Sequence, residues 1–99
     1  MSEQQVETVV ERVRAKLGAL ESTLEGLDGI RASAQSPNGW VIAQVDGSGA
    51  LTGLRLDEAA CGLDARELAI SIVATAHDAA RAAAADRVAL MDALRGALR

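Results

Sequence analysis

Residues 36–57 read SPNGWVIAQVDGSGALTGLRLD, and this stretch decides the fold. Apolar and polar side chains alternate along residues 41–46, which is the pattern of a β-strand with one buried face. Turn-forming residues flank this strand at residues 36–39 and again at residues 46–49. A similar alternation lies before the first turn and after the second. The pattern predicts an antiparallel meander of three strands, at residues 30–35, 40–46 and 51–57.

The two faces of this predicted sheet differ in composition. The first face carries the aliphatic residues Val41, Val45, Leu54 and Leu56. We expect a helix to cover it, because a bare sheet of three short strands is marginally stable. The second face carries Trp40, Ile42 and Leu51 among polar residues. We expect this face to find cover as well.

A long helix is predicted before the sheet, over residues 3–26. Its larger apolar residues recur at alternating steps of four and three, at Val6, Val10, Val13, Leu17, Leu20, Leu24 and Leu27. This is the heptad pattern of a helix that pairs with another helix. Charged residues flank the pattern at Glu7, Arg14, Lys16, Glu21 and Asp28, where such helices select partner and register. The pattern could be satisfied inside the subunit or remain open to a partner.

A second long helix is predicted after the sheet, over residues 65–97. Asp64 and Glu67 have the spacing of an N-terminal capping box, and no proline follows. The apolar positions in the middle of this helix are alanines, which let another backbone approach closely but bury little area. Three short strands cannot cover so long a helix. The sequence therefore predicts one α+β domain over residues 1–99, with the order α-β-β-β-α, that forms a homodimer.

The composition excludes several classes of function. Trp40 is the only aromatic among the 99 residues, so successive bases cannot stack on aromatic rings. One cysteine and one histidine exclude a disulfide framework, a Cys/His zinc site and a histidine-based triad within one chain. We therefore expect no enzyme, no metal and no cofactor. No run of about eighteen apolar residues is present, so we expect no membrane span and a cytoplasmic location.

Three single residues give weaker expectations. Cys61 is expected to be a small buried filler, and His77 a solvated surface residue. Arg87 falls inside the apolar positions of the second helix, so its side chain either reaches past them to water or pairs across an interface.

Two motifs carry a resemblance to a known family. One is the spaced run Gly39-x-Val41-x-Ala43-x-Val45-x-Gly47-x-Gly49, continued by Leu54-Arg55-Leu56-Asp57. The other is Ala76-His77-Asp78-Ala79-Ala80-Arg81. In this order and separation they make the chain, over about residues 8–95, resemble the YbaB/EbfC family of small bacterial nucleoid-associated proteins. The resemblance implies an α-β-β-β-α subunit, a homodimer whose helices project as paired arms, and binding to DNA with little sequence preference.

Candidate site residues follow from the charges and the uncovered apolar faces. The candidate phosphate contacts are Arg12, Arg14, Lys16, Arg81, Arg95 and Arg99. Weak, salt-dependent binding to double-stranded DNA in the nucleoid is the expected activity. The candidate residues of the dimer interface are Trp40, Ile42, Leu51, Ala76, Ala79 and Ala83.

A second function stays open at the level of sequence. The net charge is −4, the first helix is acidic, and Glu58 stands where the resembled family usually has proline. The chain looks more like the actinobacterial branch, in which some members resemble accessory proteins of type VII secretion. The alternative is therefore an acidic adaptor dimer that presents its helices to a protein partner.

Overall fold

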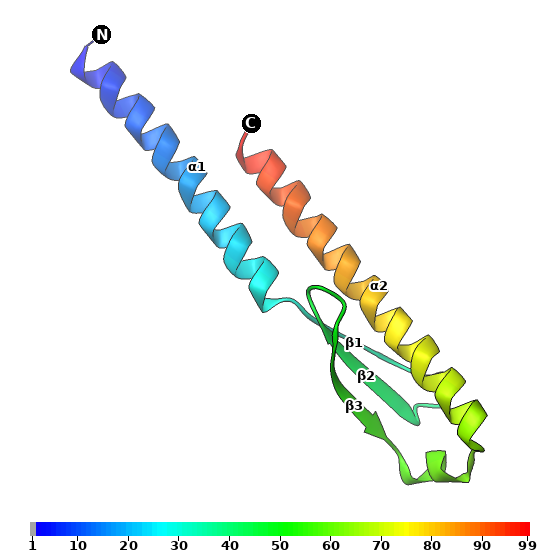
Figure 1. The fold of residues 1–99 in the computed structure, drawn as a ribbon. Coiled ribbons are helices and arrows are strands. Elements are labelled where there is room, and N and C mark those ends of the chain that lie inside the picture. Colours follow the sequence, from blue (N-terminus) through cyan, green and yellow to red (C-terminus); the bar gives the residue numbers. More distant parts are fainter. Residues whose placement is uncertain (1) are drawn as a thin grey trace.

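The computed structural model describes residues 2–99 as an elongated molecule of 75 × 17 × 16 Å (Figure 1). Its elements follow in the order α1 (Glu3–Gly29), β1 (Arg31–Gln35), β2 (Val41–Asp46), β3 (Leu51–Leu56), the short 3-10 helix η1 (Glu58–Gly62) and α2 (Ala65–Ala97). This confirms the predicted α-β-β-β-α order and the α+β class.

Both long helices begin at capping residues. The Ser2 hydroxyl accepts a hydrogen bond from the backbone of Gln5, and the Gln5 side chain bonds back to Ser2, which completes a capping box. Asp64 accepts from the backbone N–H of Glu67 at the start of α2. At its other end α1 runs to Gly29, three residues beyond the expected end, and stops where the Ile30 N–H bonds to the carbonyl of Leu27.

The three strands form one antiparallel sheet in the order β1-β2-β3. The turn between β1 and β2 is held by Asn38, whose Oδ1 accepts from the Trp40 N–H and the Ser36 hydroxyl. Gly39 and Gly49 end the two turns with φ angles of 75° and 86°, a region that side chains disfavour. These are the two turns that the sequence predicts.

A β-bulge changes the face to which the first residue of β3 belongs. Gln44 lies opposite Gly53, but Val45 lies opposite Leu51, so Thr52 is an extra residue in β3. Residues directly opposite each other share a face, so Leu51 lies on the same face as Val45. The expectation that Leu51 shares a face with Trp40 and Ile42 is therefore wrong, because strict alternation does not hold across the bulge.

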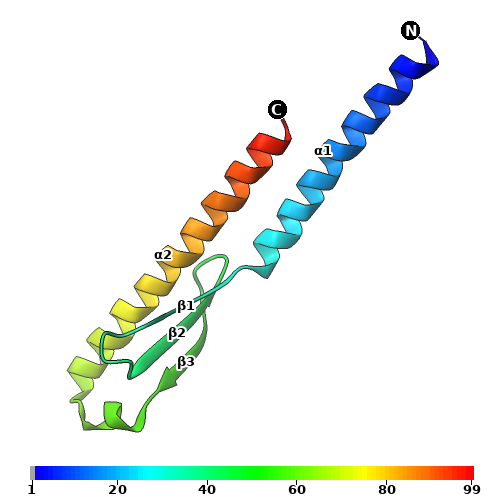
Figure 2. The same cartoon turned by 180° about the vertical axis from the view of Figure 1, so that it is seen from behind.

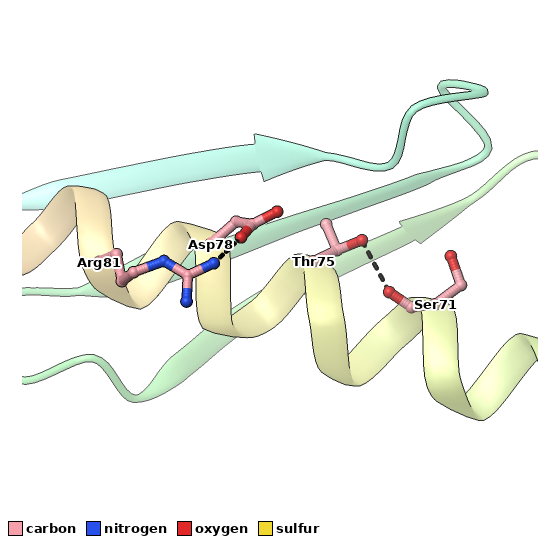
Figure 3. A network of polar contacts seen from close by, with 4 residues as sticks. All are labelled: Ser71, Thr75, Asp78 and Arg81. Atoms are coloured by element: carbon pink, nitrogen blue, oxygen red, sulfur yellow. Dashed lines mark hydrogen bonds and ion pairs between the residues drawn. The ribbon is translucent and has the colours of Figure 1, made fainter.

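The core forms where α2 packs across β1 and β2. Its fully buried members are Ala43, Val45, Ala79 and Ala83, with Ile30 and Ala32 beside them. Alanine on both elements lets the helix lie close to the sheet. Thr75 is the buried polar residue of this surface, and its hydroxyl donates to the carbonyl of Ser71 at 2.7 Å within α2 (Figure 3).

Two parts of the molecule stay outside this core. The helix α2 leaves β3 uncovered, so Leu54 and Leu56 are 40% and 45% exposed although they lie on the helix-facing side of the sheet. The C-terminal half of α1 lies beside α2, antiparallel to it, whereas its N-terminal half extends past the end of α2 (Figure 2). Within residues 2–99, neither helix combines the length and apolarity needed to cross a membrane.

Candidate nucleic-acid and partner interfaces

Two basic residues of α2, Arg81 and Arg95, lie on its solvent side, and each already holds a carboxylate. Arg81 pairs with Asp78 one turn away (Figure 3), and Arg95 lies 3.6 Å from Asp92. All four side chains are more than half exposed. Exposed ion pairs of this kind are worth less than about 1 kcal/mol, so both arginines can exchange the carboxylate for another anion.

The basic residues of α1 do not form one cluster. A helix turns by about 100° per residue, so Arg12 and Lys16 share a face and Arg14 points to the opposite one. The face with Arg12 and Lys16 is the one that packs against α2 lower down, through Ala19 and Thr23.

Helical spacing places three cations near the end of α2. Ala19 of α1 and Ala97 of α2 line the same hollow, so the next turn of α1, with Lys16, lies beside the end of α2 at Arg99. Arg12 follows one turn further along α1. We call Arg12, Lys16 and Arg99 the end patch. Among residues 2–99 these three side chains form no ion pair with a carboxylate.

The heptad residues of α1 are exposed. Val6, Val10, Val13, Leu17, Leu20 and Leu24, which we call the α1 seam, are 41–54% exposed. Helical geometry rotates the α1 seam by about 120° from the face that packs against α2. The contact inside the subunit instead uses the small residues Ala19, Thr23 and Gly26, where a side-chain carbon on Gly26 would lie 3.1 Å from Leu90. The seam is therefore not satisfied within the subunit.

A second apolar face lies over β3. It contains Leu51, Leu54 and Leu56 of β3, and on the neighbouring flank of α2 it contains Val73. Gly49, just before β3, packs against Ala80 on this flank. We call these four residues, Leu51, Leu54, Leu56 and Val73, the β3–α2 face.

The predicted interface residues are not one surface. Ala79 and Ala83 have no exposed area because they pack against β1 and β2 of their own subunit, and Ala76 packs against the same core. Ile42 lies on the outer sheet face with the half-buried Trp40, whereas Leu51 lies on the other face. The candidate surfaces for contact with a second copy are therefore the α1 seam and the β3–α2 face, and not those three alanines.

Arg87 neither reaches past the apolar positions to water nor pairs across an interface, because it forms a contact inside its own subunit. Its guanidinium donates to the carbonyl of Gly47 and is half-buried between the end of α1, the second turn and α2. Sequence reasoning missed this contact, since the two residues are forty positions apart. Cys61 is exposed in η1, so the expectation of a buried filler is wrong. His77 is exposed, as expected.

Among the described residues, no arrangement suited to chemistry on a small molecule stands out. The hollow on the outer sheet face is open and is lined by Ser33, Ile42, Gln44, Gly53 and Arg55. Over residues 2–99, no group of three or more histidine, cysteine, aspartate or glutamate residues lies close enough to hold a metal ion. The described surface instead offers exposed cations and uncovered apolar faces.

Comparison with known proteins agrees with this description. The model of the YbaB/EbfC DNA-binding family matches residues 3–98. The crystal structure of an uncharacterized protein, HP0035 from Helicobacter pylori, has the same fold with a TM-score of 0.58. The two chains are 21% identical, and the match covers 92% of this chain and 94% of that one. No curated protein matches the sequence. Nothing in these matches supports the adaptor alternative.

Proposed function

Because this chain belongs to the YbaB/EbfC DNA-binding family, we propose that it is a non-catalytic, nucleoid-associated homodimer that binds double-stranded DNA with little sequence preference. Family membership supports the DNA partner and the nucleoid location. The uncovered α1 seam and β3–α2 face support the dimer, because a soluble monomer rarely leaves so much contiguous apolar surface to water.

The end patch is the observation that carries the DNA-binding proposal. Its three cations come from two elements, are free to meet phosphates, and are doubled in a dimer. Affinity for duplex DNA comes largely from neutralised phosphates, so a local patch can bind although the net charge of the chain is −4. Arg81 and Arg95 are secondary contacts, since phosphates must first displace Asp78 and Asp92.

Little sequence preference follows from the same residues. The end patch consists of long flexible cations, which contact the phosphate backbone and carry no information about base edges. With one aromatic residue, the chain also has no platform for unpaired bases. Binding should therefore depend on salt and duplex length more than on sequence.

Charge reversal with a matched control tests the proposal. Arg12→Glu with Arg99→Glu should weaken binding to a duplex, measured by fluorescence anisotropy at low salt, by at least about tenfold. Arg55→Glu with Arg66→Glu changes the net charge equally at exposed sites away from the end patch, and should retain most of the affinity. Equal losses in the two double variants would contradict the end patch as the contact. Absence of binding by the unaltered protein at low salt would overturn the function itself.

A further inference from the structure

The N-terminal half of α1 has no neighbour within the subunit, although its sequence needs one. Residues 2–18 are all exposed, and this part of α1 extends past the end of α2 (Figure 2). It contains several β-branched residues, which lower helix propensity. They include Val6, Val9, Val10 and Val13. A helix of about fifteen residues is marginal in water without tertiary contacts, so this half of α1 should gain its stability from outside the subunit.

All the acidic residues of α1 lie on one side of the helix. At about 100° per residue they fall within a sector next to the α1 seam, on the side turned away from α2. They are Glu3, Glu7, Glu11, Glu21, Glu25 and Asp28, which we call the acidic flank. Arg14 is the cation of α1 that shares this sector. All six carboxylates are exposed, and none forms an ion pair within residues 2–99.

The spacing of the acidic flank brings like charges together. Glu7 lies four residues from Glu3 and four residues from Glu11. Glu25 stands at the same spacing from Glu21. Residues four apart are neighbours on a helix surface, and like charges at this spacing destabilise the helix. A partner that brings cations to this side would replace the repulsion by attraction.

We propose that the α1 seam is the docking surface for an amphipathic helix of a different protein, whose apolar face is flanked by lysine or arginine residues. The α1 seam covers residues 6–24, about 27 Å at 1.5 Å per residue, without a polar residue at its six positions. It faces away from α2, so the docked helix displaces none of the subunit's own packing. Cations at the edge of that helix reach the acidic flank. This protein-binding surface adds to the DNA-binding role proposed above and does not depend on it.

The acidic flank disfavours the other surfaces that could cover an apolar stripe. Unpaired carboxylates repel both DNA phosphates and anionic lipid headgroups. A second α1 in antiparallel orientation would bring the same carboxylates to this flank. In parallel orientation it would oppose Val9, Lys16 and Thr23 to the flank, but Thr23 is only 7% exposed beside its own α2 and Lys16 is the one cation of the three. The second copy is therefore left with the β3–α2 face.

Docking on the α1 seam leaves the end patch accessible. Arg12 lies about 120° around α1 from the seam, and Lys16 borders the seam on the side opposite to the acidic flank. The docked helix is therefore attracted at one edge and not at the other. We expect its cations to lie along the edge that faces the acidic flank.

Synthetic helical peptides test the docking. The probe is a fluorescein-labelled peptide of about four heptads with leucine at the apolar positions and lysine at the flanking positions. The matched peptide carries glutamate in place of lysine. In fluorescence anisotropy at about 150 mM salt, the lysine peptide should bind at least about tenfold more tightly than the glutamate peptide. A third peptide, with lysines retained and leucines replaced by serine, should bind at least about tenfold more weakly, because docking needs the apolar contact.

Substitutions in the protein locate the site. Leu17→Gln removes a 52% exposed leucine of the α1 seam and should weaken binding of the lysine peptide by at least about tenfold. Ile70→Gln is the matched control, because Ile70 is 62% exposed on α2 outside the α1 seam and the β3–α2 face. It should leave the affinity for the peptide unchanged. Glu7→Lys with Glu21→Lys should reverse the preference, so that the glutamate peptide binds more tightly.

Failure of this inference is distinct from failure of the proposed function. Absence of binding by the lysine peptide, equal affinity for the lysine and glutamate peptides, or equal losses in Leu17→Gln and Ile70→Gln would each overturn the docking surface. If the lysine peptide does not bind and Leu17→Gln halves the mass in sedimentation equilibrium, the second copy occupies the α1 seam instead. Leu17→Gln removes no cation, so its affinity for duplex DNA should stay unchanged whatever the peptides do. Loss of duplex binding by the unaltered protein would overturn the DNA-binding role and leave the peptide results standing.

Discussion

Asp46 organises the second turn through a single carboxylate oxygen. Its Oδ1 accepts from the backbone N–H of Ser48 at 2.9 Å, the Ser48 hydroxyl at 2.6 Å and the N–H of Ala50 at 3.1 Å. The Ser48 hydroxyl is the main reason that the pKa of Asp46 lies below its ordinary value of 3.8. The charged carboxylate is thus the form that holds the turn.

The lowered pKa gives stability a defined pH dependence. Stability that Asp46 contributes is fully present above its ordinary pKa and is lost as the pH falls through the lowered folded-state pKa. We expect Asp46→Ala to lower the urea midpoint at neutral pH and to lower it less as the pH falls below 3.8. Glu25→Gln, an exposed change elsewhere, is the control. A midpoint difference for Asp46→Ala that stays constant over this range would contradict the assignment.

Substitution by alanine is expected to change stability in opposite directions at two glycines. A side-chain carbon on Gly47 would lie 2.9 Å from the carbonyl oxygen of Leu27 and 3.2 Å from Ile30, whereas one on Gly18 would meet nothing within 4 Å. Gly47→Ala should destabilise by about 1–3 kcal/mol, because backbone must move. Gly18→Ala should stabilise by roughly 0.5–1 kcal/mol through helix propensity. Urea unfolding at one fixed protein concentration checks both signs.

At the scale of elements, the contact between α1 and α2 depends on a few residues. Leu94 is 9% exposed in this contact, and Val88 is 60% exposed on another side of α2. We expect Leu94→Ala to lower the free energy of unfolding by about 2–3 kcal/mol, at the low end for a buried leucine. Val88→Ala should change it by less than about 0.5 kcal/mol. Equal effects would mean that α1 and α2 do not pack through Leu94.

Element order and length were predictable because their signals are local. In the strands apolar residues recur every two positions, and in the helices they recur every three or four. These patterns, the two turns and the cap at Asp64 can each be recognised within a few residues. The face of the sheet on which each residue of β3 lies was less predictable. Thr52 shifts the register of β3 by one residue, and nothing in the alternation around it signals a bulge.

The candidate site was less predictable than the fold, since it depends on contacts between distant segments. Sequence proximity grouped Arg12 and Lys16 with Arg14, but helical geometry places Arg14 on the opposite face of α1. The alanines of α2 were expected to meet a second copy, but α2 meets its own sheet because that sheet also presents small residues, Ala32 and Ala43. Which apolar stripe a helix buries depends on both surfaces.

At the scale of the whole molecule, the number of cations sets the salt dependence. With three end-patch cations in each of two subunits, about six phosphates are neutralised, and the logarithm of the binding constant should fall with the logarithm of salt at a slope of about −5. Measurement between about 50 and 300 mM salt gives this slope. Arg12→Glu should make it shallower by roughly two, one contact from each subunit. A slope near zero would contradict electrostatic binding.

The elongated shape has a hydrodynamic consequence. A compact protein of this length has a radius of gyration of about 13 Å, whereas this chain has 20.8 Å. Friction on a rod exceeds friction on a sphere of equal mass, so a single copy migrates through a porous matrix like a considerably heavier globular protein. On a gel-filtration column calibrated with compact standards, the apparent mass of one chain would be close to that of a dimer. Masses of this protein and its variants therefore have to come from sedimentation equilibrium or light scattering, which weigh the particle independently of its shape.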